Sequence, residues 1–335
     1  MSKRLSILIM LLFILLNFDL SSSEMINGAG ATFPYPLYSS WAAEYYKATG
    51  IKINYQSIGS GGGIRQITER TIDFGASDMA LKPEELEKSK LLQFPAVIGG
   101  VVPIVNIPGI PSDSLILDGT TLCEIFLGEI KRWDDPKIKA LNPTINLPSK
   151  TIAVIYRSDG SGTTAIFTHY LSSVCKKWAD SVGYGTSVKW RTGLGAKGNE
   201  GVANYVKRTP NSIGYVEFAY AKQNRLSVAK LKNLAGQIVA PDFESFAEAA
   251  SSAILDPKNH FYAWMTNAPG KRAWPITGAT YILLAKERNE INKSVIKFFD
   301  WAFKYGDETA KKLDYVPLPK NLKEKIRAYW KTHIK

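Results

Sequence analysis

Three glycine-rich loops carry the residues of this chain that are best suited to binding an anion. They occupy residues 28–33 (GAGATF), 59–63 (GSGGG) and 159–163 (DGSGT), each just before a predicted helix. Glycine lets the backbone approach a ligand closely, and a helix N-terminus presents free N–H groups and a positive dipole end. Ser or Thr in such a loop commonly only caps the helix, so one loop is weak evidence. Three loops in one chain favour an anion-binding site.

Two charged residues near these loops are candidates to complete the site. Arg157 lies two residues before the third loop, and its guanidinium can donate a forked pair of hydrogen bonds to an oxyanion. Asp159 is positioned to hold that guanidinium in a salt bridge. Asp78 follows a predicted strand, where a carboxylate usually faces a crevice or caps a turn. Arg157 and Asp78 could equally be ordinary loop charges, and spacing alone does not decide.

The residues that usually carry catalysis or bind metals are sparse. The chain has three histidines, none in a metal-ligand pattern, and its two cysteines, Cys123 and Cys175, are far apart. Neither Ser60 nor Ser161 lies in a G-x-S-x-G sequence. We therefore expect no metal site, no cofactor and no enzymatic activity. Spacing leaves open whether the cysteines form a disulfide or stay separately buried thiols.

A dinucleotide-binding protein is the alternative that one further motif offers. Residues 193–198 (GLGAKG) fit the G-x-G-x-x-G pattern between a predicted strand and a predicted helix, with Glu217 near the expected distance. This short pattern is loose, and the sequence shows no second half of a dinucleotide fold. A secreted protein also has little access to nicotinamide cofactors, so we do not favour this interpretation.

The first 23 residues have the layout of a secretory signal peptide. Lys3 and Arg4 precede an apolar run at residues 5–16, and three serines follow at residues 21–23. The run is too short to span a bilayer, which takes roughly 20 apolar residues. We place the cut after Ser22 or Ser23, although no A-x-A sequence is present. With no cysteine nearby to carry a lipid, we expect a free periplasmic protein.

Charge and length set broad limits on partners and domains. The chain carries 42 Lys+Arg against 30 Asp+Glu, a formal net charge of +12, which favours anionic partners. No basic stripe interleaved with aromatic residues is present, so we expect no nucleic-acid binding. The length left after the signal peptide fits two lobes of ordinary domain size.

Short apolar runs alternate with amphipathic stretches, as is typical of an α/β protein. Strands are predicted at residues 51–56, 72–76, 94–107, 151–156, 187–190, 213–216 and 280–284, and helices at 38–49, 63–71, 163–171, 201–207, 295–303 and 322–330.

Long stretches of this sequence resemble the periplasmic phosphate-binding proteins of phosphate-specific ABC transporters. They include GAGATFPYPLYSSWA, NYQSIGSGGGIRQI, TIDFGASDMAL, RSDGSGTT and AWPITGATYILL, and the resemblance extends from about residue 26 to 331. It implies a type II periplasmic binding fold, in which a hinge joins two α/β lobes around a ligand cleft. The first lobe would comprise residues 24–105 and 275–335, and the second residues 106–274.

The resemblance also implies the ligand and the residues that hold it. The expected function is high-affinity binding of inorganic phosphate in the periplasm and its delivery to the permease of an ABC importer, by a chain that is a monomer. A receptor for another tetrahedral oxyanion is the alternative. The residues matching the family's phosphate ligands are Thr32, Phe33, Ser60, Asp78, Arg157, Ser161, Gly162 and Thr163.

Two of these positions bear on selectivity and affinity. Asp78 is expected to accept the proton that phosphate still carries at neutral pH, which sulfate lacks. Close relatives often have Ser where this chain has Gly61, so a hydroxyl expected near the site is absent.

Overall fold

The computed structural model of the protein describes residues 25–334. The predicted signal peptide, residues 1–23, lies outside this range. Within it, none of the helices is both long and apolar enough to cross a membrane.

Strands and helices alternate along most of the described chain. The strands are β1 (Met25–Gly30), β2 (Lys52–Ser57), β3 (Phe74–Ser77), β4 (Leu91–Asn106), β5 (Ile116–Leu117), β6 (Ala153–Arg157), β7 (Leu194–Ala196), β8 (Ser212–Glu217), β9 (Ser227–Val228), β10 (Lys230–Lys232), β11 (Ile238–Val239), β12 (Met265–Thr266) and β13 (Ile276–Ala285). The helices are α2 (Tyr35–Thr49), α3 (Ser60–Thr68), α4 (Pro83–Ser89), α5 (Gly119–Leu127), α6 (Pro136–Leu141), α7 (Gly162–Val174), α8 (Lys176–Ser181), α9 (Gly198–Arg208), α10 (Phe218–Gln223), α11 (Phe243–Ser251), the 3₁₀ helix η1 (Pro257–Asn259), α12 (Asn289–Tyr305), α13 (Asp307–Lys312) and α14 (Lys320–His333).

The predicted elements are confirmed, with ends that shift by several residues, except at residues 187–190. That segment, predicted as a strand, is irregular, and the strand of this region is β7, further along the chain. The ring of Trp190 stacks on Tyr156 at 4.9 Å between ring centroids. The apolar residues of the segment therefore reflect a loop that packs its aromatic side chain against β6, not a strand in the sheet.

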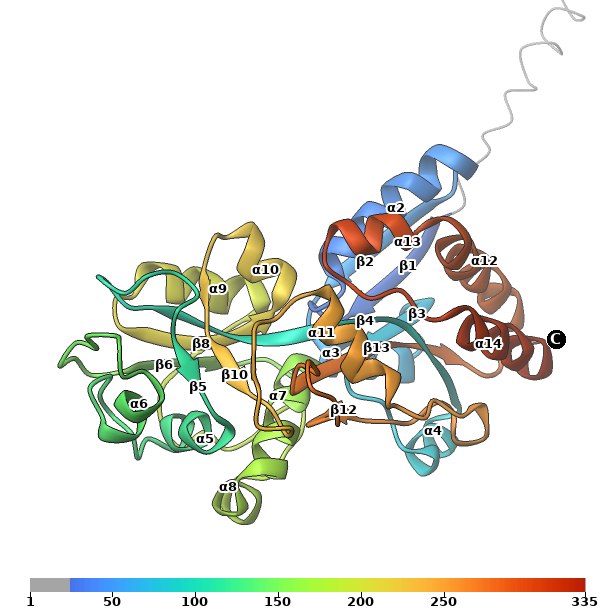
Figure 1. The fold of residues 1–335 in the computed structure, drawn as a ribbon. Helices are drawn as coiled ribbons and strands as arrows, with labels where there is room; N and C mark the ends of the chain where they lie inside the picture. The colour runs from blue at the N-terminus through green and yellow to red at the C-terminus, as the bar shows by residue number, and fades with distance from the viewer. Residues whose placement is uncertain (1–24, 335) are drawn as a thin grey trace, which may run out of the picture.

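One long strand joins the two halves of the sheet. The order is β2-β1-β3-β13-β4-β8-β6-β7, and β4 pairs with β13 through residues 91–100 and with β8 through residues 101–106. Figure 1 shows β4 running between a group that contains β1 to β3, α2 and α12 to α14 and a group that contains β5, β6, β8, α5, α6, α9 and α10. The chain is thus an α/β protein built around a shared central strand.

The segment after α11 lies beside the first group, although the sequence assigns it to the second lobe. β12 pairs with β13, and the imidazole Nδ1 of His260 lies 2.7 Å from the hydroxyl of Tyr329 on α14. The lobe boundaries at residues 105/106 and 274/275 stay a prediction.

Three parallel-paired strands end where the candidate ligand residues begin. β1 pairs in parallel with β2 and β3, and β6 pairs in parallel with β7 and β8. Thr32 follows the end of β1, Asp78 follows β3 directly, and Arg157 is the last residue of β6. Open α/β sheets bind ligands at the carboxyl ends of their strands, and the topology brings these residues to that edge.

Helix α2, which follows Thr32 and Phe33, is anchored by aromatic packing. Tyr38, Trp41 and Tyr45 are each 3% exposed or less. Tyr38 meets Phe299 and Tyr45 meets Phe298 edge to face, with ring centroids 5.8 and 5.2 Å apart. Burial of these rings against α12 fixes α2 and therefore the loop at its N-terminus.

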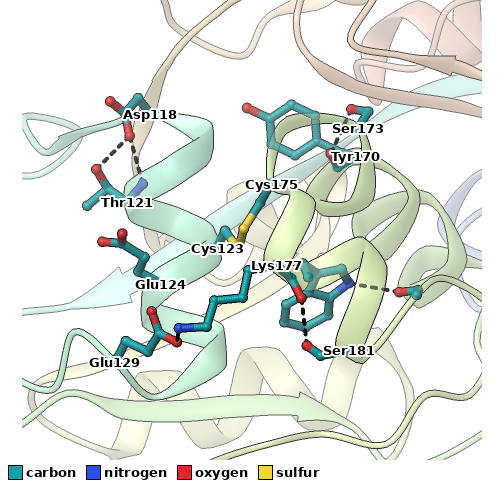
Figure 2. Close-up of a disulfide and its surroundings, with 12 residues drawn as sticks. Asp118, Thr121, Cys123, Glu124, Glu129, Tyr170, Ser173, Cys175, Lys177 and Ser181 are labelled. Carbon is teal, nitrogen blue, oxygen red and sulfur yellow. Dashed lines mark hydrogen bonds and ion pairs between the residues drawn. A yellow bond between two sulfur atoms is a disulfide. The ribbon is translucent and has the colours of Figure 1, made fainter.

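A disulfide joins Cys123 and Cys175, the pairing that the sequence leaves open. Cys123 lies on α5 and Cys175 follows α7 directly, with Cα atoms 6.5 Å apart. Figure 2 shows the sulfur bridge between the two helices, beside the ion pair of Lys177 with Glu129. The bridge ties the C-terminal end of α7 to α5, while the N-terminal end of α7 reaches the candidate site.

Replacement of both cysteines by alanine is expected to lower the free energy of unfolding by about 2–4 kcal/mol. A bridge that closes a loop of this length mainly restricts the unfolded chain. Urea denaturation of the parent and the double variant, without reductant, measures the difference. Free thiols detected in the denatured, unreduced parent would contradict the pairing.

Candidate functional site

The second and third glycine-rich loops touch each other directly. The N–H of Gly61 donates to the carbonyl of Gly160 at 2.9 Å. The N–H of Gly162 donates to the hydroxyl oxygen of Ser60 at 3.0 Å, and so does the N–H of Asp78, at 3.2 Å. Residues from both halves of the sheet therefore close over one another at this point.

Two glycines permit this close approach. A Cβ at Gly162 would lie 2.5 Å from the Ser60 hydroxyl oxygen and 2.6 Å from the backbone nitrogen of Asp78, so any side chain there would force the segments apart. A Cβ at Gly61 would lie 3.1 Å from the Cα of Gly160. A side chain at position 61 would thus crowd the contact between the loops.

Asn199, in the first turn of α9, connects the first loop to the third. Its side-chain amide donates to the hydroxyl oxygens of Thr32 at 2.6 Å and Thr163 at 3.2 Å. The sequence analysis missed Asn199 because it places the start of that helix at residue 201. The signal present in the sequence is a polar residue directly after the glycines of residues 193–198.

The structure gathers the eight residues predicted as ligands into this buried region, and their role in binding stays a prediction. Six of them belong to the buried polar residues, and all side chains among the eight are 3% exposed or less: Thr32, Phe33, Ser60, Asp78, Arg157, Ser161 and Thr163, with Gly162 also buried.

Arg157 is held in place by one carboxylate and keeps one nitrogen free. Its Nε and Nη2 donate to the two oxygens of Asp159 at 2.8 and 2.6 Å, which realises the predicted salt bridge. Its Nη1 is buried and has no hydrogen-bond partner among the described residues. Burial acts to raise the pKa of Asp159, but the hydrogen bond and charge of Arg157 hold that pKa below its ordinary value. A buried guanidinium nitrogen without an acceptor is suited to an anion.

Asp78 is the acidic member of the site. Burial raises its pKa from 3.8 to about 7, against the lowering effect of the Thr280 hydroxyl and the charge of Arg157. The Thr280 hydroxyl donates to Oδ1 of Asp78 at 2.7 Å. Asp78 is therefore poised between its neutral and charged forms near neutral pH.

The carbonyls of Thr32 and Phe33 are both bound by tyrosines. The Tyr220 hydroxyl donates to the Thr32 carbonyl at 2.6 Å, and the Tyr315 hydroxyl lies 2.7 Å from the Phe33 carbonyl. The backbone N–H groups of Thr32 and Phe33 donate to no acceptor within residues 25–334. These two amides are thus available to an anion, and sequence reasoning missed both tyrosines.

Helix α7 supplies further donors through its first turn. The hydroxyl of Ser161 accepts the N–H of Thr164 at 3.0 Å and so caps the helix. The positive dipole end of this helix lies beside Asp78 and Ser60, and within residues 25–334 the N–H of Thr163 is the one donor of its first turn without an acceptor. The resulting site offers many hydrogen-bond donors, one fixed positive charge and one protonatable carboxyl.

Two other kinds of site find no support in the described part of the chain. No group of three or more His, Cys, Asp or Glu within residues 25–334 is placed to hold a metal ion. His169 stacks on Trp264 with ring centroids 3.9 Å apart, and burial lowers its pKa to about 4.

In residues 193–198, β7 lies inside the glycine motif and not before it, so the motif lacks the strand–loop–helix order of a dinucleotide site.

Known proteins resemble this chain over nearly its whole length. The PBP superfamily domain matches residues 19–304. The phosphate-binding protein PstS of Haemophilus influenzae is 55% identical over 94% of this chain and 95% of its own length. The phosphate-binding protein PstS of Pasteurella multocida is 56% identical over 94% of this chain and 92% of its own.

Solved structures share the fold. The high-affinity periplasmic phosphate-binding protein PfluDING, determined with bound phosphate, aligns with a TM-score of 0.71 and 25% identity over 90% of this chain and 93% of its own. The phosphate-binding protein of Stenotrophomonas maltophilia aligns with a TM-score of 0.70 and 22% identity, over 91% of this chain and 93% of its own.

Asp78→Asn is expected to stabilise the anion-free protein at alkaline pH. A carboxyl whose pKa is raised from 3.8 to about 7 binds its proton more tightly in the folded protein than in the unfolded chain. The folded parent therefore loses stability as pH rises from about 4 to about 7, by up to about 4 kcal/mol, and asparagine avoids that loss.

Urea denaturation at about pH 4 and about pH 8 measures this difference. The control is Asp180→Asn, which removes an exposed carboxylate that pairs with Lys176. Equal effects of Asp78→Asn at both pH values would show that Asp78 is not the titrating group.

Proposed function

This chain belongs to the PstS family of phosphate-binding proteins within the PBP superfamily, and we propose that it binds one inorganic phosphate ion between its glycine-rich loops and delivers it to the permease of an ABC importer. The observation that carries the proposal is that a guanidinium with an unused donor and a carboxyl that titrates near neutral pH are buried in the same site. Arg157 keeps one guanidinium nitrogen free, and Asp78 has a pKa near 7. A dehydrated anion that also carries a proton matches both groups.

The hydrogen-bonding capacity of phosphate explains why an acid belongs in an anion site. Monohydrogen phosphate has three charged oxygens that accept hydrogen bonds and one hydroxyl that donates. The amides of Thr32 and Phe33, the hydroxyls of Ser60 and Thr163, and Arg157 supply donors, and Asp78 supplies the one acceptor. Sulfate has no proton at neutral pH, so it would meet the carboxylate of Asp78 with repulsion and an unmatched acceptor.

Lobe closure couples binding to delivery. With the lobes at residues 24–105 plus 275–335 and at residues 106–274, Ser60 and Asp78 come from the first lobe and Arg157 and Thr163 from the second. Only an arrangement with both lobes in contact satisfies the ion, so phosphate shifts the hinge equilibrium toward the closed form. The permease then distinguishes loaded from unloaded protein by this form.

The protein performs no reaction on its ligand, in keeping with a family of substrate-binding transport proteins. The predicted signal peptide at residues 1–23 directs it to the periplasm, where it carries phosphate as a monomer. The lysine-rich surface, with a formal net charge of +12 for the whole chain, speeds its encounter with anions.

Calorimetric titration of the mature, anion-free protein is expected to show one-to-one binding of phosphate and no binding of sulfate. In Asp78→Asn the ratio of the two dissociation constants should fall by about 100-fold or more, because the amide no longer repels sulfate. Asp180→Asn serves as the matched surface control. Equal binding of both ions by the parent would assign the site to oxyanions in general.

Arg157→Lys is expected to weaken phosphate binding by about 10- to 100-fold, because lysine keeps the charge but cannot serve Asp159 and the ion with one planar fork. The control is Arg65→Lys on the exposed face of α3. Unchanged affinity in Arg157→Lys would remove Arg157 from the phosphate ligands.

A further inference from the structure

Glu217 is a buried acid near the phosphate site that the proposed function leaves unused. It is the last residue of β8 and caps α10, with Oε2 accepting the N–H of Ala219 at 3.0 Å. The residue is fully buried, and no lysine or arginine among the described residues donates a hydrogen bond to its carboxyl. An unpaired carboxylate is very unfavourable in such a place, so the protonation state of Glu217 needs an explanation.

The groups that face Glu217 from the neighbouring elements are neutral or negative. Tyr315 contacts it directly, and the charges of Asp78 and Asp314 both disfavour a second negative charge there. Lys222 on α10 is engaged by Asp314 at 2.7 Å and is more than half exposed. No described cation is therefore placed to stabilise an ionised Glu217.

The Tyr315 hydroxyl makes two short contacts but has only one proton to donate. Its hydroxyl oxygen lies 2.7 Å from the Phe33 carbonyl oxygen and 2.8 Å from Oε2 of Glu217. The carbonyl has no proton, and a tyrosine hydroxyl has one. Both short contacts are full hydrogen bonds only if Tyr315 donates to Phe33 and Glu217 donates to Tyr315.

We propose that Glu217 is a positioning residue for the phosphate site, whose neutral carboxyl donates its proton to Tyr315 and thereby commits the Tyr315 hydroxyl to the carbonyl of Phe33. An ionised Glu217 would instead accept a hydrogen bond from the Tyr315 hydroxyl, which would then no longer donate to the Phe33 carbonyl. Burial raises the pKa of Glu217 well above its ordinary value, against the lowering effect of its contacts with Tyr315 and Ala219, and the charge of Asp78 adds to the rise.

This chain of hydrogen bonds acts on the loop that carries the Phe33 amide. Tyr315 holds the carbonyl of the peptide group between Phe33 and Pro34, and Tyr220 holds the Thr32 carbonyl, which shares its peptide group with the Phe33 N–H. The two tyrosines therefore fix the peptide groups on both sides of Phe33, and with them the direction of its free N–H. A neutral Glu217 also keeps a second negative charge away from the phosphate.

The backbone of Glu217 supports the same loop from the other side. Its N–H donates to the side-chain oxygen of Asn199 at 2.9 Å, and the amide of Asn199 donates to the hydroxyl oxygens of Thr32 and Thr163. One strand end of β8 thus orients groups of the first and third glycine-rich loops.

Infrared difference spectroscopy tests the protonation state without reference to any ligand. The parent minus Glu217→Gln, at neutral pH, is expected to show the C=O band of a protonated carboxylic acid. A carboxylate band in that difference spectrum would overturn the proposal. This result stands whether or not the protein binds phosphate.

Calorimetry with inorganic phosphate tests the positioning role, which rests on the proposed function. Glu217→Ala and Tyr315→Phe should each weaken binding by about tenfold, the effect of one hydrogen bond. The double variant should bind phosphate about as well as either single variant, because both changes break the same chain of hydrogen bonds. Glu217→Gln should lie between the parent and Glu217→Ala, because its amide nitrogen can donate to Tyr315 but cannot also accept the N–H of Ala219 as Oε2 does.

Additive losses, about 100-fold in the double variant, would show that Glu217 does not act through Tyr315, and unchanged affinity in both single variants would remove the role altogether. Failure of Glu217→Ala to fold leaves Tyr315→Phe and the infrared measurement to decide. A parent that binds no phosphate would refute the proposed function, while the infrared spectra would still report on Glu217.

Discussion

The burial of Arg157 together with Asp78 constrains how the surrounding chain is arranged. A guanidinium removed from water needs acceptors, and Asp159 satisfies only two of its nitrogens. A buried carboxyl needs donors, and Thr280 supplies one from the distant strand β13. Almost every other group at the site is a neutral amide, hydroxyl or carbonyl. The site therefore satisfies charge with oriented dipoles and not with further ions, which leaves room for the charge of the ligand.

Much of the fold can be predicted from the sequence, because the strands and helices have clear apolar periodicity and their loops have clear glycine signals. The exception at residues 187–190 has a physical cause, since Trp190 buries its ring from a loop. Periodicity reports which side chains are buried, and it cannot tell a strand from an extended loop that packs one face. The disulfide between Cys123 and Cys175 could likewise not be predicted, because the spacing of the cysteines does not reveal which helices lie side by side.

In the candidate site, contacts between residues close in the sequence could be predicted, and contacts between distant segments could not. Asp159 could be assigned to Arg157 because the two are close in sequence, and the glycine loops mark their own backbone geometry. Tyr315 could not be found, because it reaches the first loop from 282 residues away, whereas Asn199 had only the local signal of a polar residue after the glycines of residues 193–198. Glu217 entered the sequence analysis only as part of a dinucleotide pattern, and the fold gives it a different setting.

The place of β13 in the sheet has a consequence for the order in which the protein folds. β13 lies between β3 and β4, so residues 276–285 complete the part of the sheet that contains the N-terminal strand. The elements around the disulfide, in contrast, come from one continuous stretch of chain. Because long-range pairings form slowly, the half of the molecule that contains the N-terminal strands β1 to β3 is expected to complete its folding last. During synthesis its strands stay incomplete until nearly the whole polypeptide has emerged.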